Sequence, residues 1–342
     1  MNSSGVPADV SSSSRTSVLD FVLRFQGYFG LLAILLVSTL LSPHGADGHN
    51  IFLDTDNLLD IARFASENGI IAIGMTLVIL TAGIDLSVGA VLAIGAVGVA
   101  ACLTRYHLGT FPAAFLVLGL GALIGAANGL ITTRLAIQSF ITTLAIMSVV
   151  RGAASLWAGG NAIPLSFGSE KGDASPLFKS LFAGQINLVG LAIPVQMLFF
   201  IATGVIATFV LGRTGFGRHV YAVGSNETAA RLSGVGVARV RVLVFAISGF
   251  LAALAALLHA AMVNQGSHID GQGYELNAIA AVVIGGTSLS GGSGTVAGSM
   301  VGALILSMLD NILGLKNIPS EYQMILKGAI IVLAVVLQRG RK

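Results

Sequence analysis

The sequence predicts an all-α fold, a polytopic transmembrane helical bundle of about ten spans with interrupted helices. Of its 342 residues, 55% are hydrophobic and only 10% are charged, and the mean hydropathy is +0.89. A soluble domain carries about 25% charged residues, because its surface must be solvated. Apolar runs of about 17–25 residues, the length of a helix that crosses a bilayer, recur along the chain. Continuous runs favour helices over barrel strands, which alternate apolar and polar residues.

Ten apolar segments carry the predicted spans and together define a transmembrane domain over residues 26–338. In chain order they cover residues 26–42, 67–82, 86–103, 111–133, 139–157, 187–211, 240–263, 275–290, 294–313 and 322–338. The second and third segments are separated only by a break at Ala82–Asp85. The eighth segment is short and runs into Gly- and Ser-rich residues near Gly285. The sequence at both breaks indicates an interrupted helix, a feature that often marks a transport pathway.

The charges of the loops predict the orientation, because cytoplasmic loops carry an excess of Lys and Arg. The loop 212–241 holds five arginines against one acid: Arg213, Arg218, Arg231, Arg239 and Arg241 against Glu227. The first loop on the other side holds five acids against Arg63: Asp47, Asp54, Asp56, Asp60 and Glu67. We therefore expect both termini in the cytoplasm. They would form a polar tail over 1–25, without the cleavage site of a signal peptide, and a basic tail over 339–342.

Glycines spaced four residues apart predict close packing of helices, because such a strip lets two backbones approach. Two such ladders occur: Gly121, Gly125 and Gly129, and Gly294, Gly298 and Gly302. Each ladder could form an interface with a second subunit, or it could pack helices of one chain together.

Polar residues inside a membrane are costly and often functional, so they are candidates for a pathway. The candidates are Asp85, Ser87, Asn128, Asn264 and Gln265. Each also has a structural interpretation. Asp85 and Ser87 could cap the helix that follows the break, and Asn128 could hydrogen-bond across helices. Asn264 and Gln265 could form a hydrated helix end.

Other polar or reactive residues point to no chemistry. Arg151 and Lys327 lie within predicted spans and are expected to snorkel toward a surface rather than to contact a substrate. Trp157 fits an interfacial anchor, and His259 receives no role. The single cysteine, Cys102, excludes an intrachain disulfide and a cysteine metal cluster. We expect no catalytic residue, no metal and no cofactor, and the net charge of +3 is too small to indicate nucleic acid.

The loop 212–241 is predicted to contain a two-turn helix that projects into the cytoplasm. Ser225 or Asn226 can cap its first turn, where Glu227 is favourably placed, and Gly234 is a natural terminator. Such a helix, tethered to spans at both ends, could pass motion from a soluble partner into the membrane. It could equally be a solvated loop that only fixes topology.

Four blocks of sequence resemble the ribose-type ABC sugar permeases, in the order that is usual in that family. They are residues 73–89, 139–152, 212–234 and 275–296, and with the stretches between them they cover most of the chain after the first segment. One departure is Ser139, where a proline is usual in the family; it affects the entry of a helix rather than the resemblance itself.

The resemblance implies the membrane-spanning subunit of an importer in the bacterial inner membrane. Its partners would be cytoplasmic ABC ATPase subunits, a periplasmic sugar-binding protein and a second permease copy, identical or closely homologous, within membrane lipid. The resemblance also implies an ATPase-coupling helix, in which Arg231 would matter most. Its residues would be Asn226, Glu227, Thr228, Ala229, Ala230, Arg231, Leu232, Ser233 and Gly234. The chain has no phosphate-binding G-x-x-x-x-G-K-[ST] loop, so ATP hydrolysis is expected from a separate subunit.

Two other classes of protein remain as alternatives. A secondary transporter driven by an ion gradient would usually need a relay of acidic residues across the membrane, and the sequence pattern indicates none. An intramembrane enzyme would need a catalytic motif such as H-E-x-x-H or G-x-S-x-G, and neither occurs. The two breaks, 81–91 and 286–296, also resemble each other, either through an internal duplication or because Gly-rich sequences repeat by chance.

Overall fold

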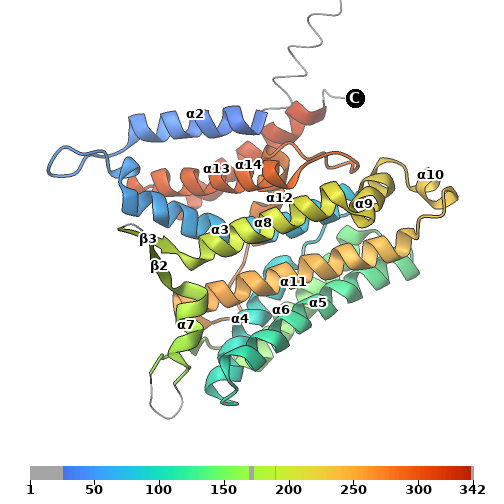
Figure 1. Ribbon diagram of the computed structural model, residues 1–342, viewed down its shortest axis with the longest axis horizontal. Helices are drawn as coiled ribbons and strands as arrows, with labels where there is room; N and C mark the ends of the chain where they lie inside the picture. Colours follow the sequence, from blue (N-terminus) through green and yellow to red (C-terminus); the bar gives the residue numbers. More distant parts are fainter. Residues whose placement is uncertain (1–25, 169–172, 189, 340–342) are drawn as a thin grey trace, which may run out of the picture.

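The structure is a computed structural model that describes residues 26–168, 173–188 and 190–339. The predicted tail 1–25 and residues 340–342 of the basic C-terminal tail lie outside this part of the chain. Long helices running side by side dominate the described residues, so the all-α prediction is confirmed (Figure 1).

Each of the ten apolar segments corresponds to a helix. These helices are α2 (Gln26–Leu41), α3 (Thr55–Leu80), α4 (Val88–Thr104), α5 (Thr110–Arg134), α6 (Ser139–Ala158), α8 (Val195–Arg213), α11 (Val237–Val263), α12 (Tyr274–Ile284), α13 (Val296–Leu315) and α14 (Ser320–Arg339). Within the described residues, six of them are long and apolar enough to cross a membrane: α3, α5, α6, α8, α11 and α13. The apolar helices α2, α4 and α12 are shorter. The number of ten spans therefore stays a prediction.

Short elements connect the long helices. They are the 3-10 helix η1 (Ile51–Leu53), the helices α7 (Pro176–Ala183), α9 (Gly215–Ser225) and α10 (Glu227–Leu232), and the strands β1 (Ile163–Pro164), β2 (Gln185–Leu188), β3 (Leu191–Pro194) and β4 (Gln265–Gly266). Strand β1 pairs with β4, and β2 pairs with β3, both antiparallel. Figure 1 shows α7 and the β2–β3 hairpin at one end of the long helices and α9 and α10 at the other end.

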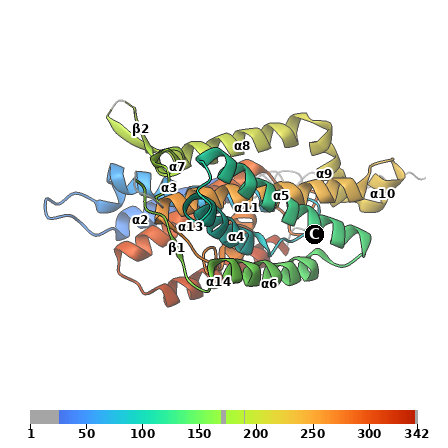
Figure 2. The same cartoon turned by 90° about the horizontal axis from the view of Figure 1, so that it is seen from below.

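Helix α4 forms the centre of the core. Every residue from Val88 to Leu103 is buried, which explains why this helix is apolar all round instead of having one polar face. It packs against α5, α6 and α11, while α3 packs against α11, α12 and α13. In Figure 1, α2, α13 and α14 lie on one side of this core and α5 and α6 on the other. Figure 2 shows the same helices from below, with α9 and α10 again at one end.

The glycine ladders pack helices within this chain. A Cβ atom added at Gly121 or Gly125 would overlap the backbone of α11, at Gly249 and Phe245 respectively. Gly129 likewise faces Val242, so the whole first ladder lies against α11.

Only two of the three glycines of the second ladder lie in one helix. Gly298 and Gly302 lie against the backbone of α12, at Gly285 and Ala281. Gly294, in contrast, precedes α13 and sits in a loop with a φ of +149°, so its assignment to the ladder is wrong. The four-residue spacing continued past the start of the helix, where it no longer describes one helical face.

Both predicted helix interruptions are present, and they touch each other. Residues 81–87 separate α3 from α4, and residues 285–295 separate α12 from α13. The backbone N–H of Gly292 donates to the carbonyl of Leu80 at 3.0 Å. The last residue of α3 is thereby joined to the loop between α12 and α13, which lies far away in the sequence.

Two predicted segments begin elsewhere in the structure. Helix α3 begins twelve residues before the predicted start, at Thr55, where the Asp54 side chain accepts a hydrogen bond from Asp56 N. Its first turns carry polar residues, so a count of apolar runs missed them, and Glu67 lies in mid-helix and is only 2% exposed. The sixth segment was predicted to start at 187, but residues 185–188 and 191–194 form the paired strands β2 and β3, and α8 follows Pro194.

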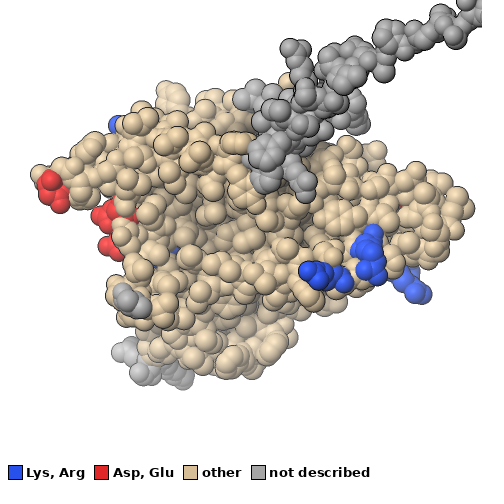
Figure 3. All heavy atoms as spheres, turned by 45° about the horizontal axis from the view of Figure 1, so that its top comes forward, with Lys and Arg blue, Asp and Glu red and all other residues tan. Residues whose placement is uncertain are grey.

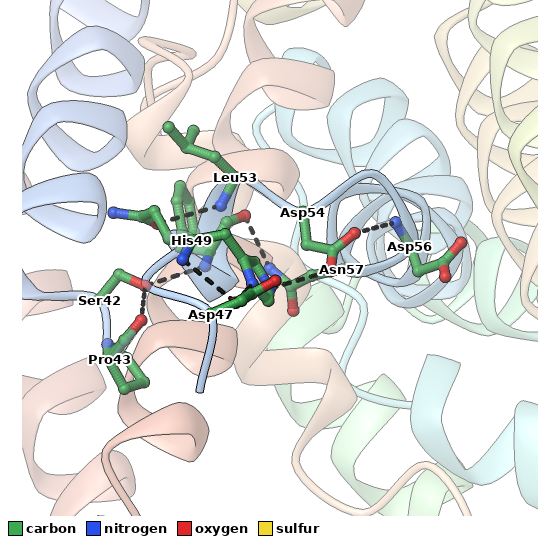
Figure 4. A network of polar contacts seen from close by, with 10 residues as sticks. Ser42, Pro43, Asp47, His49, Leu53, Asp54, Asp56 and Asn57 are labelled. Atoms are coloured by element: carbon green, nitrogen blue, oxygen red, sulfur yellow. Dashed lines mark hydrogen bonds and ion pairs between the residues drawn. The ribbon is translucent and has the colours of Figure 1, made fainter. Parts of the chain in front are cut away.

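The connection between α2 and α3 is held by polar contacts. The ring of His49 lies against Asp47 and 3.5 Å from Asp54, as Figure 4 shows. The hydroxyl of Ser42 accepts from the N–H of Phe52, and Asn57 at the start of α3 exchanges hydrogen bonds with Asn311 of α13. On the face drawn in Figure 3, acidic side chains lie at this end of the molecule, and a group of basic side chains lies at the opposite end.

Candidate functional site

The helix predicted in the loop 212–241 is present as α10, over Glu227–Leu232. The Asn226 side chain caps it by accepting a hydrogen bond from Ala229 N at 2.9 Å. Gly234, with a φ of +83°, ends it in a conformation that favours glycine. A second helix, α9, precedes it, and the Thr214 hydroxyl caps that helix by accepting from Gly217 N at 3.2 Å. The sequence analysis did not identify α9.

One ion pair joins α10 to the start of α11, and a second lies within α10. Glu227 accepts from Arg231 at 2.5 Å within α10 and from Arg241 of α11 at 2.7 Å. Arg231 nevertheless has a side chain that is 69% exposed, and the neighbouring Leu232 is 84% exposed. A rigid helix therefore presents a cation and a large apolar side chain together. Arginine is enriched among the residues that dominate binding at protein interfaces.

The end of α9, just before α10, contacts the second helix break and the last residue of α3. The Tyr221 hydroxyl donates to the carbonyl of Gly294 at 2.9 Å, and the Ser225 hydroxyl lies 3.5 Å from the carbonyl of Gly292. Gly224 is so close to Leu80 and Gly292 that an added Cβ atom would overlap their backbones. A displacement of α9 and α10 would thus act directly on the end of α3 and on the loop that precedes α13.

Three of the five pathway candidates come together in a buried polar network next to the first break. Asp85 accepts from the N–H of Ser87 at 3.0 Å and from its hydroxyl at 2.7 Å, and Asn128 donates to the Ser87 hydroxyl at 2.8 Å. The hydroxyl of Ser248, on α11, donates to the second oxygen of Asp85 at 3.0 Å. These four side chains are at most 1% exposed. We call them the inner network.

The inner network explains how the break is held. Ser87 makes no side-chain cap to α4, and the Asp85 carboxylate instead accepts the N–H of Ser87. Ser248 was missed by the sequence analysis, although a serine next to Gly249 in an apolar span is a signal for a polar contact between helices.

The other two pathway candidates lie elsewhere. Asn264 ends α11 in a left-handed conformation, with a φ of +56°, and its carbonyl accepts from the N–H of Leu165. Gln265 is exposed in β4, opposite Pro164. Both residues are exposed at the end of α11 opposite to its start near α10, as a hydrated helix end would be.

Two cations predicted to snorkel have specific partners instead. Arg151 donates to the carbonyls of His268 at 2.7 Å and Asp270 at 2.6 Å, which ties α6 to the loop before α12. Lys327 of α14 pairs with Asp310 of α13 at 2.8 Å. Their partners come from distant parts of the chain, so the local sequence carried no sign of them.

A cavity of 490 Å³ opens between α3, α12, α13 and α14, and the sequence analysis did not predict it. Its wall includes Glu67, whose carboxylate lies 2.9 Å from His259 Nδ1. The other ring nitrogen of His259 lies 3.7 Å from Asp270. This buried acidic cluster differs from the acid-poor interior that the sequence indicated. Across the residues that the structure describes, no group of three or more His, Cys, Asp or Glu is arranged to hold a metal ion.

Comparisons with known proteins agree on one family. A family model described as a permease component of a branched-chain amino acid transport system matches residues 57–335. The chain is 39% identical to the ribose import permease protein of Haemophilus influenzae, across 95% of this chain and 96% of that protein. It is 40% identical to the ribose import permease protein of Bacillus subtilis, across 94% and 95% respectively. Its identity to the xylose transport system permease protein of Escherichia coli is 35%, across 92% of each chain.

Proposed function

The chain belongs to this family of ABC transport permeases and is of the ribose type, and from that premise we propose that it carries ribose or a related monosaccharide in an ATP-driven importer. The observation that carries the proposal is the similarity to ribose import permeases over nearly the whole length of both chains. The xylose permease adds a second pentose transporter at lower identity.

The proposed assembly contains two permease copies, identical or closely homologous, two cytoplasmic ATPase subunits and a periplasmic sugar-binding protein. Each copy would cross the bacterial inner membrane about ten times, with both termini in the cytoplasm. The basic side chains at the α9–α10 end support this orientation, since cytoplasmic loops are rich in Lys and Arg. The sugar would cross between the two copies. ATP hydrolysis would come from the partner, because the chain has no phosphate-binding loop.

The coupling helix of this machine would be α10 with its caps, Asn226 to Gly234. Arg231 and Leu232 would insert into the ATPase, while Glu227 keeps the helix rigidly attached to α11 through Arg241. Because the end of α9 contacts both the end of α3 and the second break, movement of the ATPase would reach α3 and the loop before α13 together. The inner network would hold the first break in shape while it moves. Asn264 and Gln265 stay candidate sugar contacts at the outer end.

The proposal is tested by purifying the tagged chain from its native membrane in mild detergent and identifying the proteins that come with it. An Arg231→Glu variant removes the charge offered to the partner, and Arg134→Glu, an exposed arginine at the end of α5, is the matched control. We expect an ABC ATPase with the unmodified chain and with Arg134→Glu, and at least about tenfold less of it with Arg231→Glu, since charge pairs at the centre of an interface are costly to break.

Two other outcomes would change the account. An ATPase retained equally by Arg231→Glu would remove Arg231 from the coupling contact. No ATPase with any variant, under conditions that preserve known importers, would favour the alternative of uptake driven by an ion gradient, for which the buried Glu67, His259 and Asp270 would be the first residues to test.

A further inference from the structure

An apolar groove of 520 Å³ lies between the end of α4, the first half of α5 and the end of α6. Its volume is within the range of about 300–1,000 Å³ that small-molecule sites occupy. Among the described residues that line it, only Cys102, Tyr106 and Trp157 carry a polar atom in the side chain, and the others are aliphatic residues, a phenylalanine and a glycine. A ligand of this groove must therefore be apolar over most of its length.

The groove opens toward the lipid and has the depth of one leaflet. It follows α5 from Phe115 to Leu123, whose side chains are 73% and 69% exposed. A Cβ atom added at Gly119, between them, meets no atom within 4 Å, so the space over the helix is open. Eight residues of α-helix rise about 12 Å, and one leaflet of the hydrocarbon core is about 15 Å deep. An acyl chain of one leaflet can therefore lie along the groove.

The groove belongs to the leaflet that is remote from α10. Helix α5 runs antiparallel to α11, because Gly129 faces Val242 near the start of α11 and Gly121 faces Gly249 farther along it. The start of α11 follows α10 directly in the chain. The first half of α5, which lines the groove, thus lies at the other end of the molecule.

Two aromatic residues mark the mouth of the groove. The indole N–H of Trp157 lies 3.4 Å from the hydroxyl of Tyr106 and donates to it. Trp and Tyr are enriched at the level of the lipid headgroups, where their rings contact both apolar and polar surroundings. The ring of Trp157 also packs on α4, so closely that a Cβ atom added at Gly98 would lie 3.1 Å from it. One indole thus forms a fixed wall that leads from the mouth into the groove.

A cation stands beside this mouth. Arg105 is exposed, and its guanidinium group donates to the carbonyls of Trp157 at 3.0 Å and Ala158 at 3.3 Å, at the end of α6. These two bonds alone would be those of a helix C-terminal cap. A guanidinium group has five N–H donors, however, so donors remain for a further acceptor. Held by α6, the group offers the planar fork that matches a phosphate.

The surroundings of the mouth favour a headgroup with a net negative charge. From Leu86 to Gly168 the sequence contains no Asp or Glu, so α4, α5 and α6 bring no acid to the groove. An anionic headgroup next to Arg105 therefore meets no repulsion from these helices. A zwitterionic headgroup would instead bring its own cation close to the guanidinium group, which weakens its attraction.

We propose that this groove binds an anionic phospholipid, with one acyl chain along α5 and against Trp157 and with its phosphate on Arg105. The site is separate from the α9–α10 end and from the inner network. It goes beyond the proposed function, because it requires only that the chain lies in a membrane. The competing occupant is a second copy of the permease, which would keep lipid out of the groove.

The fluorescence of Trp157 reports on the groove directly, because it is the only tryptophan of the chain. The full-length chain is reconstituted in phosphatidylcholine vesicles that contain a small fraction of phospholipid with brominated acyl chains, which quench tryptophan on contact. The brominated lipid is phosphatidylglycerol in one series and phosphatidylcholine in the other. We expect phosphatidylglycerol to bind about fivefold more tightly, the effect of one arginine on an anionic lipid. Equal quenching in the two series would overturn the proposal.

Two arginine variants test the phosphate contact. Arg105→Gln removes the charge but keeps an amide that can still donate to the carbonyls of α6. It should reduce the preference for phosphatidylglycerol to about twofold or less. Arg134→Gln is the control, because Arg134 is exposed at the opposite end of α5, and it should keep the full preference. An unchanged preference in Arg105→Gln would show that Arg105 does not bind the phosphate.

A third variant tests the path of the acyl chain. Gly119→Phe fills the groove without a backbone clash and should remove most of the quenching at a low content of brominated phosphatidylglycerol. Val205→Phe, at a 64% exposed position of α8, is the control and should be quenched like the unmodified chain. Full quenching of Gly119→Phe would mean that lipid reaches Trp157 outside the groove. An unmodified chain that is not quenched even in vesicles made entirely of brominated lipid would assign the groove to a second copy and refute the lipid site.

Discussion

The inner network and the cavity wall are both buried polar clusters in an apolar bundle, and they differ in how well their polar atoms are satisfied. In the inner network both oxygens of Asp85 accept hydrogen bonds, and of the four side chains only Asn128 leaves a buried atom unpartnered. On the cavity wall three acceptors, on Glu67, Asn68 and Asp310, have no donor among the residues that the structure describes. The first pattern is that of a structural joint. The second leaves buried polar atoms without donors, which costs free energy instead of joining helices.

The largest difference is expected from two identical substitutions at glycines. Gly125 faces the backbone of Phe245 where α5 packs on α11, whereas Gly314 faces open space in the cavity. Most of the Gly125→Leu protein should therefore fail to fold, since overpacking against a backbone costs about 3 kcal/mol or more. Gly314→Leu should fold normally, and replacing a helical glycine should even help it by up to about 1 kcal/mol. Size-exclusion chromatography of both variants in detergent measures the folded fraction. Equal recovery of the two would contradict the difference in packing between Gly125 and Gly314.

A second pair of substitutions compares the polar atoms themselves. Asp85→Ala leaves the hydroxyl of Ser248 and the N–H of Ser87 without their acceptor, so we expect a loss of about 2–4 kcal/mol in unfolding free energy. Asn68→Ala removes an acceptor that has no donor, and its effect should be within about 0.5 kcal/mol. Thermal unfolding in the same detergent reports both changes. A destabilisation by Asn68→Ala as large as that of Asp85→Ala would mean that the cavity wall is a structural joint too.

Within the inner network, a smaller loss of stability tests whether Ser248 acts through its hydrogen bond to Asp85. Ser248→Ala removes one donor to Asp85 and should cost about 1 kcal/mol. Combined with Asp85→Ala it should add almost nothing, because the two residues share one hydrogen bond. Additive losses of stability in the double variant would show that Ser248 acts through another contact.

The smallest expected effect lies in the loop between α2 and α3, which borders the cavity through the Asn57–Asn311 pair. A hydrogen bond with Asp47, helped by the charges of Asp47 and Asp54, raises the pKa of His49 above its ordinary value of 6.5. A raised pKa means that the contact contributes fully below about pH 6.5 and is lost as the pH rises through the higher folded-state value. Hydrogen exchange of residues 42–57 should therefore speed up with rising pH, beyond its intrinsic dependence, and His49→Ala should abolish this excess. An excess that persists in His49→Ala would assign it to another group.

The sequence predicted the features that local signals encode. Asn226 and Gly234 mark the ends of α10 by their own chemistry, and the short spacing around Asp85 marks the first break. The cavity could not be predicted in this way, because its wall joins Glu67 to Lys327 across most of the chain. Glu67 was assigned to a loop because the first turns of α3 contain polar residues and therefore do not form an apolar run. Gly294 shows the opposite error, in which a correct spacing was extended to a residue that lies before the start of α13.

The most direct test of the whole account is ATP-driven uptake by the purified complex in proteoliposomes. Labelled ribose and xylose are offered with the binding protein outside and ATP inside, with and without an ionophore that collapses ion gradients. The account predicts uptake of at least one pentose that requires ATP and the binding protein and that the ionophore leaves unchanged. Uptake that the ionophore abolishes, and that proceeds without ATP, would contradict it and identify a transporter driven by an ion gradient.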